Sequence, residues 1–458
     1  MAISVFDIYK IGVGPSSSHT FGPMVAAQRF LRELQDEGAF EATAKAEVQL
    51  YGSMALTGKG HFTDLAAMLG LEGNEPATLD SAAIPAKRRR IETEKTLHLG
   101  GKTYLPFDPA RDIHWHGEHV YETHPNGIAF RALGADGGEV KRGLYFSIGG
   151  GFIVCEQESL NPKDAVGDVE KPFPYTTAEQ LGGLCAREGV PISEIVRRNE
   201  RTWRSDAEIR DGLLAIAAAM DRSVEVGLAA EGEIPGGLGL KRHAKELYEL
   251  AQGETWGAEL FQLQDYVNAY ALAVMEVNAT LGQVVTAPTM GSSGIVPAVL
   301  RAYKQFAKNV TDDDVCNFLL ASAGCAIPVK LNASFSGAEV GCQGEVGAAS
   351  LMAATGLCEV LGGNVHQVLN AGAMALEHNL GLTCDPVAGL VQVPCIKRNA
   401  LAANKAINAV RLTMLRGDEP MRPSFDQVVT VLRLTGEDMS DKYKETSQGG
   451  LAVVWVDC

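Results

Sequence analysis

Residues 346–361 read Val-Gly-Ala-Ala-Ser-Leu-Met-Ala-Ala-Thr-Gly-Leu-Cys-Glu-Val-Leu, a run of small and aliphatic side chains with one charged residue, Glu359. Such a stretch, rich in good helix formers, favours an α-helix over a strand. The same Ala/Leu/Val-rich character recurs in four other segments, 209–230, 258–281, 297–306 and 400–415. The sequence therefore predicts that residues 179–458 form a mostly α-helical domain.

The first 155 residues have a different pattern. Five apolar residues recur at helical spacing, Met24, Ala27, Phe30, Leu31 and Leu34. Residues 46–51 and 143–148 have the composition of strands, and further strands are expected within 96–120. Residues 1–155 are therefore predicted to form an α+β domain. Residues 156–178 are charged and contain prolines, so they are expected to link the two domains.

Composition and charge exclude several classes of protein. At 458 residues the chain is long enough for at least two domains. The net charge of −16 argues against nucleic acid and anionic membranes as partners, because both are bound through Lys and Arg. The longest charge-free stretch, 277–300, contains two prolines and a Gly-Ser loop and is a poor membrane span. The N-terminus lacks the pattern of a signal peptide, so we expect a cytoplasmic protein.

Three of the nine cysteines lie in loops marked by Gly or Pro: Cys342, Cys384 and Cys395. A fourth, Cys458, ends the chain. Three fixed thiolates and one at the chain end suit an iron–sulfur cluster with one exchangeable iron, which acts as a Lewis acid. The alternative is that they are structural, since buried cysteines are common. The remaining five are expected to be small buried hydrophobes: Cys155, Cys185, Cys316, Cys325 and Cys358.

Two loops rich in hydroxyl groups are candidate substrate-binding sites. Gly14-Pro-Ser-Ser-Ser-His-Thr20 precedes a predicted helix, where hydroxyls and backbone N–H groups can bind a carboxylate. The second loop, Thr286–Gly294, has the same character. Simple helix capping is the alternative explanation for both loops. For the second loop, capping fits nearly as well as ligand binding does. The candidate substrate contacts are Ser16, Ser17, Ser18, Thr20, Thr289, Ser292 and Ser293.

His61 is a candidate base. Glycines flank Lys59 and predict an exposed turn that carries both Lys59 and His61 ahead of a helix. A histidine in such a place can remove a proton near neutral pH, although a plain surface histidine fits equally well. The segment His114-Trp-His116-Gly-Glu-His119 has the composition of a metal site. Its strand-like alternation leads us to discount it.

These motifs together resemble the bacterial iron–sulfur L-serine dehydratases in their single-chain form. The resemblance rests on residues 16–20, 52–64, 236–241 and 287–294 and on the three cysteine loops, and it runs over essentially the whole length. It implies a [4Fe-4S] cluster on Cys342, Cys384 and Cys395, with Cys458 able to fold back onto the open iron. It also implies a homodimer, and an N-terminal domain similar to the serine-binding regulatory domain of some phosphoglycerate dehydrogenases. The apolar end of the chain, Gly449–Cys458, is expected to pack into a cleft.

The resemblance leads to a hypothesis for the chemistry. L-serine would be converted to pyruvate and ammonia, with the open iron as Lewis acid for the serine hydroxyl. His61 would remove the α-proton, with His19 as second candidate, and Lys59 and the hydroxyl groups would orient the substrate. The active site would lie between the two domains. Two alternatives remain: a pyridoxal-phosphate enzyme using Lys59 or Lys397, and a cluster-bearing redox or amino-acid sensor.

Overall fold

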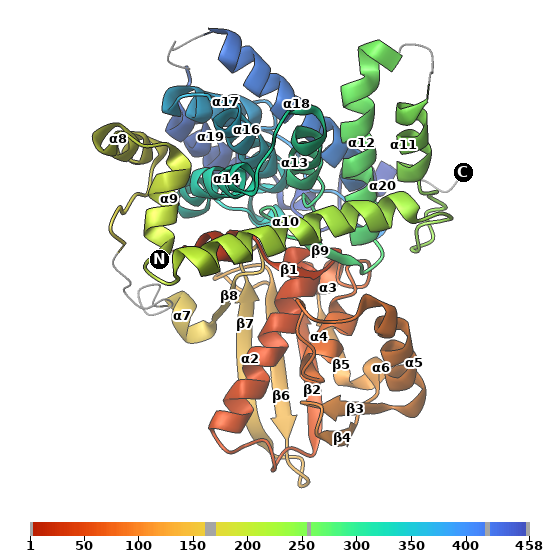
Figure 1. Cartoon of the computed structure of the whole chain (residues 1–458). Helices are drawn as coiled ribbons and strands as arrows, with labels where there is room; N and C mark the ends of the chain where they lie inside the picture. Colours follow the sequence, from red (N-terminus) through yellow and green to blue (C-terminus); the bar gives the residue numbers. More distant parts are fainter. Residues whose placement is uncertain (1–2, 161–170, 254–257, 417–421, 455–458) are drawn as a thin grey trace.

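The structure of the chain is a computed structural model that describes residues 3–160, 171–253, 258–416 and 422–454. In the view of Figure 1, a domain built on a β-sheet lies below a helical domain. The sheet domain comes from the N-terminal third of the chain and the helical domain from the rest. The predicted fold class, an α+β domain followed by a mostly α-helical domain, is confirmed.

The N-terminal domain is built on a sheet of five strands: β2 (Lys45–Tyr51), β5 (Ile113–His116), β6 (Gly127–Leu133), β7 (Glu139–Ser147) and β8 (Ile153–Cys155). Their order is β5-β2-β6-β7-β8. β2 runs parallel to β5, and the other neighbours are antiparallel. Alternate residues of β2, namely Ala46, Val48 and Leu50, are buried, because successive side chains of a strand point to opposite faces.

Two helices supply the other half of this core. α2 (Gly22–Asp36) buries the five apolar residues whose spacing predicted a helix, and α4 (Thr63–Leu71) packs beside it. Their side chains join the buried face of the sheet in one cluster. Smaller elements complete the domain: α3 (Ser53–Leu56), α5 (Ile84–Glu94), the hairpin β3 (Thr96–Leu99) with β4 (Thr103–Pro106), and α6 (Pro109–Asp112). The strands predicted within 96–120 are thus confirmed as β3, β4 and β5.

The helical domain consists mainly of long helices: α8 (Ala178–Glu188), α9 (Ile192–Glu200), α10 (Asp206–Ala229), α11 (Ala244–Gln252), α12 (Ala258–Asn278), α13 (Ile295–Phe306), α14 (Asp312–Asn332), α16 (Ala348–Val360), α17 (Val365–Glu377), α18 (Cys395–Arg416) and α19 (Phe425–Asp438). α14 and α16 pack against each other in the core, and residues 348–358 of α16 are all buried. α10 runs along the base of this domain, beside the sheet domain (Figure 1). The run at 346–361 therefore forms a central helix, as its composition predicted.

The first residues of the chain belong with the helical domain, although they were predicted to fall in the α+β domain. Ile3, the helix α1 (Val5–Ile8) and Tyr9 pack in the core of the helical domain. β1 (Ile11–Val13) then pairs with β9 (Gln283–Val285), far along the chain. The sequence does not indicate this pairing of β1 with β9, because strand pairing between distant segments depends on tertiary packing.

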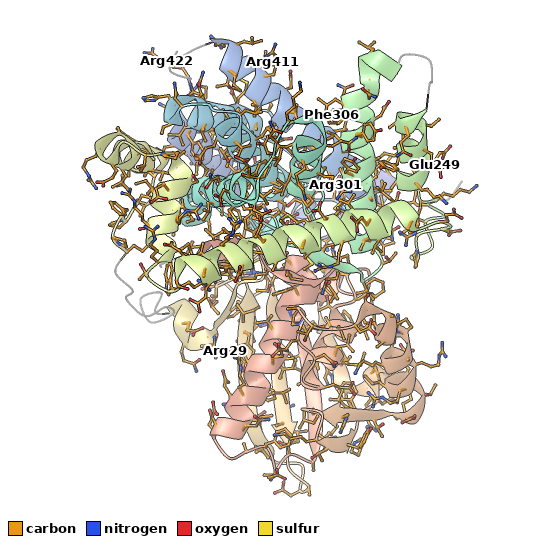
Figure 2. All side chains as sticks on the ribbon, viewed as in Figure 1. Arg29, Glu249, Arg301, Phe306, Arg411 and Arg422 are labelled. Atoms are coloured by element: carbon orange, nitrogen blue, oxygen red, sulfur yellow. The ribbon has the colours of Figure 1, made fainter. Side chains whose placement is uncertain are left out.

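Further contacts hold the two domains together. The predicted linker begins with a short helix, α7 (Glu156–Leu160), while residues 161–170 lie outside the described residues. Glu158 of α7 pairs with Arg29 of α2, which is labelled in Figure 2, and so ties the start of the linker to the sheet domain. Gly149–Gly151 joins β7 to β8. Two half-buried lysines donate to backbone carbonyls of this turn and of the residue before it: Lys10 to Gly150 and Gly151, and Lys330 to Ile148.

One helix among the described residues, α14, is long and apolar enough to cross a membrane by length and composition. Its most apolar window is 78% buried inside the protein. A helix at the centre of a folded domain passes the same test, and α14 packs against α9, α10 and α16. We therefore interpret α14 as a core helix.

A glycine at the crossing of α10 and α12 provides a test of this packing. A Cβ atom at Gly227 would lie 2.2 Å from the carbonyl oxygen of Ala273. We expect Gly227→Ala to lower the free energy of unfolding by about 1–3 kcal/mol, because the helices must move apart. Gly183 of α8 is the control, since a Cβ there meets nothing within 4 Å. Gly183→Ala should instead stabilise the protein by about 0.5–1 kcal/mol. Urea denaturation measures both, and equal effects would contradict the packing.

Candidate active site

The three cysteines singled out by the sequence converge on one buried site. Cys342 follows the short helix α15 (Gly337–Val340), Cys384 lies in the loop after α17, and Cys395 is the first residue of α18. All three are buried and line one small cavity. The Sγ atoms of Cys342 and Cys384 lie 3.7 and 4.0 Å from the same carboxylate oxygen, Oε2 of Glu345. Loops separated by 41 and 10 residues thus meet at one point.

The charges around the thiols favour one thiolate. A hydrogen bond from Cys384, helped by the guanidinium of Arg398, lowers the pKa of Cys342 to about 7 against the effect of burial. Burial and the neighbouring Cys342 raise the pKa of Glu345 well above its usual range. Cys342, Glu345 and Cys384 place their ligand atoms within 4.8 Å of one another, as the ligands of a metal do. These three side chains could therefore hold a metal ion.

Two histidines of the N-terminal domain face this site. The rings of His19 and His61 stack at 4.6 Å between centroids. Oε1 of Glu445 lies 3.3 Å from Nδ1 of His19 and 3.8 Å from Nε2 of His61. Although burial alone would raise it, the two histidines hold the pKa of Glu445 below its usual range. His61 and Glu445 line the cavity of the cysteines, so both domains contribute to one site.

His61 is buried, with 1% of its surface exposed, which corrects the prediction of an exposed turn. The reason is a close contact between the domains: a Cβ atom at the neighbouring Gly60 would lie 2.6 Å from the carbonyl oxygen of Gly389. The turn that carries His61 is therefore covered by the 3-10 turn Val387–Gly389, between Cys384 and Cys395. The local sequence cannot indicate that His61 is buried, since the residues that cover it lie more than 300 positions away.

The hydrogen bonds of His61 define its tautomer. Nδ1 lies 3.0 Å from the carbonyl oxygen of Thr57, which can only accept, so Nδ1 carries the ring proton and Nε2 has a free lone pair. The Thr20 hydroxyl donates to the backbone carbonyl of His61 at 2.6 Å. Burial lowers the pKa of His61 to about 4, which keeps the ring neutral near pH 7. The ring is thus held in the form of a proton acceptor.

Lys59 lies apart from this site. Its side chain is 71% exposed, and its ammonium group lies 2.6 Å from Oδ2 of Asp64. The same group sits 4.5 Å from the centre of the Trp115 ring. Lys59 does not line the cavity of the cysteines. The structure therefore places this predicted catalytic residue on the surface, two positions from His61 but directed to other partners.

The predicted hydroxyl groups of residues 16–20 take different positions. Ser16 lines the cavity and also accepts a hydrogen bond from the backbone of His19, as a helix cap does. The Ser18 hydroxyl lies 2.9 Å from Nδ1 of His19 and 3.5 Å from the Glu445 carboxylate. Ser17 is turned to the helical domain, where its Oγ accepts from the backbone N–H of Met290 at 2.7 Å. Ser16 can therefore meet a ligand in the cavity, Ser18 supports His19 and Glu445, and Ser17 connects the domains.

The second hydroxyl loop contributes mainly structure. The hydroxyls of Thr289 and Ser292 lie 3.0 Å apart, and Thr289 also interacts with Glu345. Ser293 turns to Met275, 3.6 Å from its sulfur. Gly291 is the residue of this loop that lines the cavity. The loop is thus at the site, and its backbone approaches the cavity more closely than the predicted hydroxyl groups do.

Comparison with known proteins decides the family. A family described as "Serine dehydratase beta chain" matches residues 4–158, and one described as "Serine dehydratase alpha chain" matches residues 187–452. The chain is 45% identical to "L-serine dehydratase" of Streptomyces coelicolor over 458 residues, covering 100% of both chains. The chain belongs to the serine dehydratase family. This confirms the resemblance drawn from the motifs.

Other members of the serine dehydratase family show similar likeness over their whole length. "L-serine dehydratase" of Mycobacterium bovis is 47% identical over 456 residues, covering 99% of this chain and 98% of the relative. "L-serine dehydratase 1" of Escherichia coli is 44% identical over 453 residues, covering 98% and 99%. The alpha-chain and beta-chain regions of the family thus occur here in one chain, and each supplies residues to the candidate site.

Sequence reasoning missed Glu345 and Glu445. Glu345 lies three residues after Cys342 in the same helical turn, a spacing that could have indicated a shared site. Glu445 carries no such signal. It lies 50 positions after Cys395, in left-handed backbone (φ 56°) stabilised by its N–H donating to the carbonyl of Cys384 at 2.7 Å. Only the fold brings this carboxylate between the two histidines.

The end of the chain differs from the prediction where it is described. Cys458 lies outside the described residues. Residues 451–454 form a short helix, α20 (Leu451–Val454), anchored by the N–H of Leu451 donating to Asp385 at 2.7 Å. Leu451, Val453 and Val454 are exposed. The predicted packing of this apolar run into a cleft is therefore wrong for residues 451–454, because the helix is held by a polar contact instead.

The remaining motifs lie apart from the cavity of the cysteines. His114 and His116 lie on β5, where Nε2 of His116 lies 2.6 Å from Oε1 of Gln49. His119 stacks at a tilt on Tyr51. None of the three histidines lines the cavity of the cysteines. Of the five cysteines expected to be structural, four are buried and one is half-buried: Cys185, Cys316, Cys325 and Cys358, and Cys155.

Proposed function

We propose that this protein is an L-serine dehydratase that converts L-serine to pyruvate and ammonia. The observation that carries the proposal is the single cavity lined by Cys342, Cys384 and Cys395 from one domain and by Ser16 and His61 from the other. It is supported by the relatives named L-serine dehydratase, which match over their full length. A redox or amino-acid sensor of the same family would need the thiols but not a buried histidine held as a proton acceptor.

The thiols fit a [4Fe-4S] cluster by the chemistry of their donor set. Iron–sulfur clusters are bound by cysteine thiolates, and Cys342, Cys384 and Cys395 are buried thiols that line one cavity with polar neighbours. Arg398 supplies a positive charge that offsets thiolate charge there. In this proposal the three cysteines hold the cluster, and Cys458 is an additional ligand from the chain end. When bound, the cluster supplies a Lewis acid for the substrate hydroxyl.

We assign the role of base to His61. Its Nε2 has a free lone pair and lies at the cavity, with Nδ1 fixed by Thr57. Both ring nitrogens of His19 have closer partners, since Nε2 lies 3.1 Å from the Ser53 hydroxyl and Nδ1 contacts Ser18 and Glu445. His61 is therefore placed to take the α-proton of serine, while His19 positions Glu445.

The polar groups around the histidines match the two charged ends of an amino acid. The Glu445 carboxylate can accept from the substrate ammonium group. The hydroxyl of Ser16, which lines the cavity, can donate to the substrate carboxylate. Loss of the α-proton and of hydroxide, which leaves as water, yields an enamine. The enamine tautomerises to an imine, and water then hydrolyses the imine to pyruvate and ammonia.

We also propose that the protein is a cytoplasmic homodimer. Three leucines of α18 are exposed, Leu401, Leu412 and Leu415, which supports self-association as a homodimer. The cysteines of the described residues are free thiols, which supports a reducing, cytoplasmic location. The net charge of −16 supports the absence of nucleic acid and membrane partners. Light scattering of the purified protein measures the mass of the assembly.

The proposed activity has a direct test. Protein purified without oxygen should form pyruvate and ammonia in equal amounts from L-serine, and the rate should fall when iron is removed by a chelator. Absence of pyruvate from a preparation with intact iron would refute the dehydratase. Trapping of a cofactor on lysine by borohydride would support the pyridoxal-phosphate alternative instead. Binding of serine without turnover would support the sensor.

The charge of Glu445 should be visible in the titration of His61. Its carboxylate stabilises the protonated ring and so raises the pKa of His61, which burial brings down to about 4. Glu445→Gln removes this negative charge, so the pKa of His61 should fall further and the neutral form should persist to lower pH. NMR of selectively labelled histidine rings measures the shift.

The control for this titration is Glu437→Gln, on the surface of α19, where Glu437 pairs with Arg433. It should leave the His61 titration unchanged. A higher pKa of His61 in Glu445→Gln would contradict the arrangement.

A further inference from the structure

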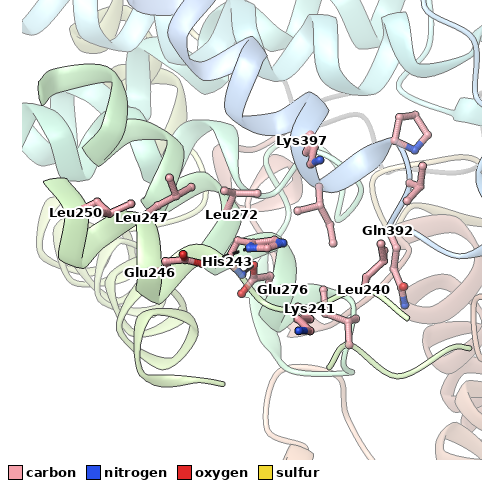
Figure 3. Close-up of a pocket in the computed structure, with 14 residues that line it drawn as sticks. Leu240, Lys241, His243, Glu246, Leu247, Leu250, Leu272, Glu276, Gln392 and Lys397 are labelled. Atoms are coloured by element: carbon pink, nitrogen blue, oxygen red, sulfur yellow. Dashed lines mark hydrogen bonds and ion pairs between the residues drawn. The ribbon is translucent and has the colours of Figure 1, made fainter. Parts of the chain in front are cut away.

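A second cavity lies in the helical domain, outside the candidate active site. Its volume is about 700 Å³, within the range of small-molecule pockets. It lies between the loop before α11, the helices α11 and α12, and the segment Gln392–Lys397 at the start of α18 (Figure 3). It shares no lining residue with the cavity of the cysteines.

Most of the wall is apolar. It is formed by branched aliphatic side chains from four segments of the chain: Ile234, Leu240, Leu247, Leu250, Leu272, Val393 and Ile396. Leu247 and Leu250 come from α11 and Leu272 from α12, and all three are labelled in Figure 3. A wall of this kind favours a ligand with an apolar body.

Two buried oxygens of residues that line this cavity have no hydrogen-bond partner among the described residues: Oε2 of Glu276 and Oε1 of Gln392. The other side-chain atoms of the same residues are fixed. Oε1 of Glu276 accepts from the backbone N–H groups of His243 and Ala244, at 2.7 and 3.2 Å, and Nε2 of Gln392 donates to the carbonyl of Pro235 at 2.7 Å. Both residues line the cavity. Buried acceptors are normally paired, so these two indicate a donor that a ligand supplies.

Two lysines at the same cavity offer the opposite charge. Lys241 and Lys397 are exposed residues of its lining, and neither pairs with a carboxylate in the described part of the chain. They come from different walls, as Figure 3 shows. An anionic group near the opening would meet two ammonium groups.

We infer that this cavity binds a free amino acid with a large apolar side chain. The ligand's ammonium group meets Glu276 and Gln392, its carboxylate meets Lys241 and Lys397, and its side chain packs on the aliphatic wall. L-serine lacks the apolar side chain and is not the ligand of this site. The cavity is thus a second site, with a class of ligand different from that of the candidate active site.

The position of the cavity connects it to the candidate active site. Pro394 and Ile396, which line it, are the two neighbours of Cys395. The glycine-rich loop at 236–241 also contacts this segment, since a Cβ at Gly236 would lie 3.0 Å from Nε2 of Gln392. A bound amino acid therefore contacts the residues that hold Cys395 in place, and we expect it to change the rate of the reaction.

Equilibrium dialysis of the whole protein, kept without oxygen, tests the site with radiolabelled L-leucine and L-phenylalanine. At least one of them should bind saturably at one site per chain, and excess glycine should not displace it. Leu247→Trp, which fills the cavity, should abolish binding. Glu276→Gln keeps an acceptor for the backbone but loses the charge, and it should weaken binding by roughly tenfold. Leu434→Trp, on the exposed face of α19, should change nothing.

Three outcomes overturn the inference: no saturable binding of either amino acid, binding that survives both Leu247→Trp and Glu276→Gln, or displacement by glycine. A change of oligomeric mass in Leu247→Trp without amino-acid binding would assign the cavity to a contact between copies and would also overturn it. Thermal unfolding measures whether each variant is folded. Lys397→Ala, at an exposed position, is a further variant, and it should weaken binding. Dialysis needs no turnover, so a failure of the proposed activity remains distinguishable.

Discussion

Cys395→Ala is expected to give a protein that retains its fold and loses both its bound iron and its turnover of L-serine. Cys395 is one of three buried thiols at the cavity, and a cluster with one protein ligand removed is released. The departure of the substrate hydroxyl is then no longer assisted by a Lewis acid, so serine turnover should fall to background. Iron and sulfide content, the visible absorption spectrum and pyruvate formation measure the effect together.

Cys155→Ala is the matched control for this experiment. Cys155 is a half-buried thiol on β8, away from the cavity, so its loss should leave iron content and turnover unchanged. If Cys395→Ala kept its iron and colour, Cys395 would not be a ligand. Loss of iron in both variants would point to damage of the fold rather than to ligation, and circular dichroism separates these cases.

His61→Ala is expected to keep its iron content while turnover of L-serine falls by about 10²- to 10⁴-fold, the usual contribution of a general base. The imidazole is the acceptor at the cavity, and water is a far weaker base in its place. The ring makes no hydrogen bond to a cysteine in the described structure, so the thiols should remain in place. Anaerobic kinetics and iron analysis on the same preparation measure both quantities.

Lys59→Ala is the control for the histidine. Lys59 lies two residues away on the same turn, but its ammonium group pairs with Asp64 on the surface. Its loss should change turnover by less than about twofold, since exposed ion pairs contribute little. Near-normal turnover in His61→Ala would exclude His61 as the base. A large loss in Lys59→Ala would return Lys59 to the catalytic residues.

The fold could be predicted where local pattern and tertiary packing agree. The spacing of Met24, Phe30 and Leu34 indicated one buried face of α2, and the small residues of 346–361 indicated a helix at the centre of the second domain. The pairing of β1 with β9 could not be predicted, because it joins residues about 270 positions apart and no local periodicity records such a partner.

The candidate site could be predicted in part. The Gly- and Pro-marked loops identified the cysteines, since such loops hold thiols out of helices. The burial of His61 and the partnership with Glu445 depend on the contact of Gly60 with Gly389, which is a property of the closed domain interface. Lys59 was predicted to share the site of His61 because the two residues are close in sequence. That closeness does not fix the direction of the Lys59 side chain, which pairs with Asp64 instead.

In our proposal, thiols of one domain and a histidine of the other form one metal-dependent active site. The most direct test is to measure iron, inorganic sulfide and L-serine turnover in the same anaerobic preparation, before and after removal of the metal. Equal amounts of iron and sulfide are expected, and pyruvate formation should be lost with the metal and restored when the cluster is rebuilt. Full activity in protein free of iron and sulfide would contradict a metal-dependent site.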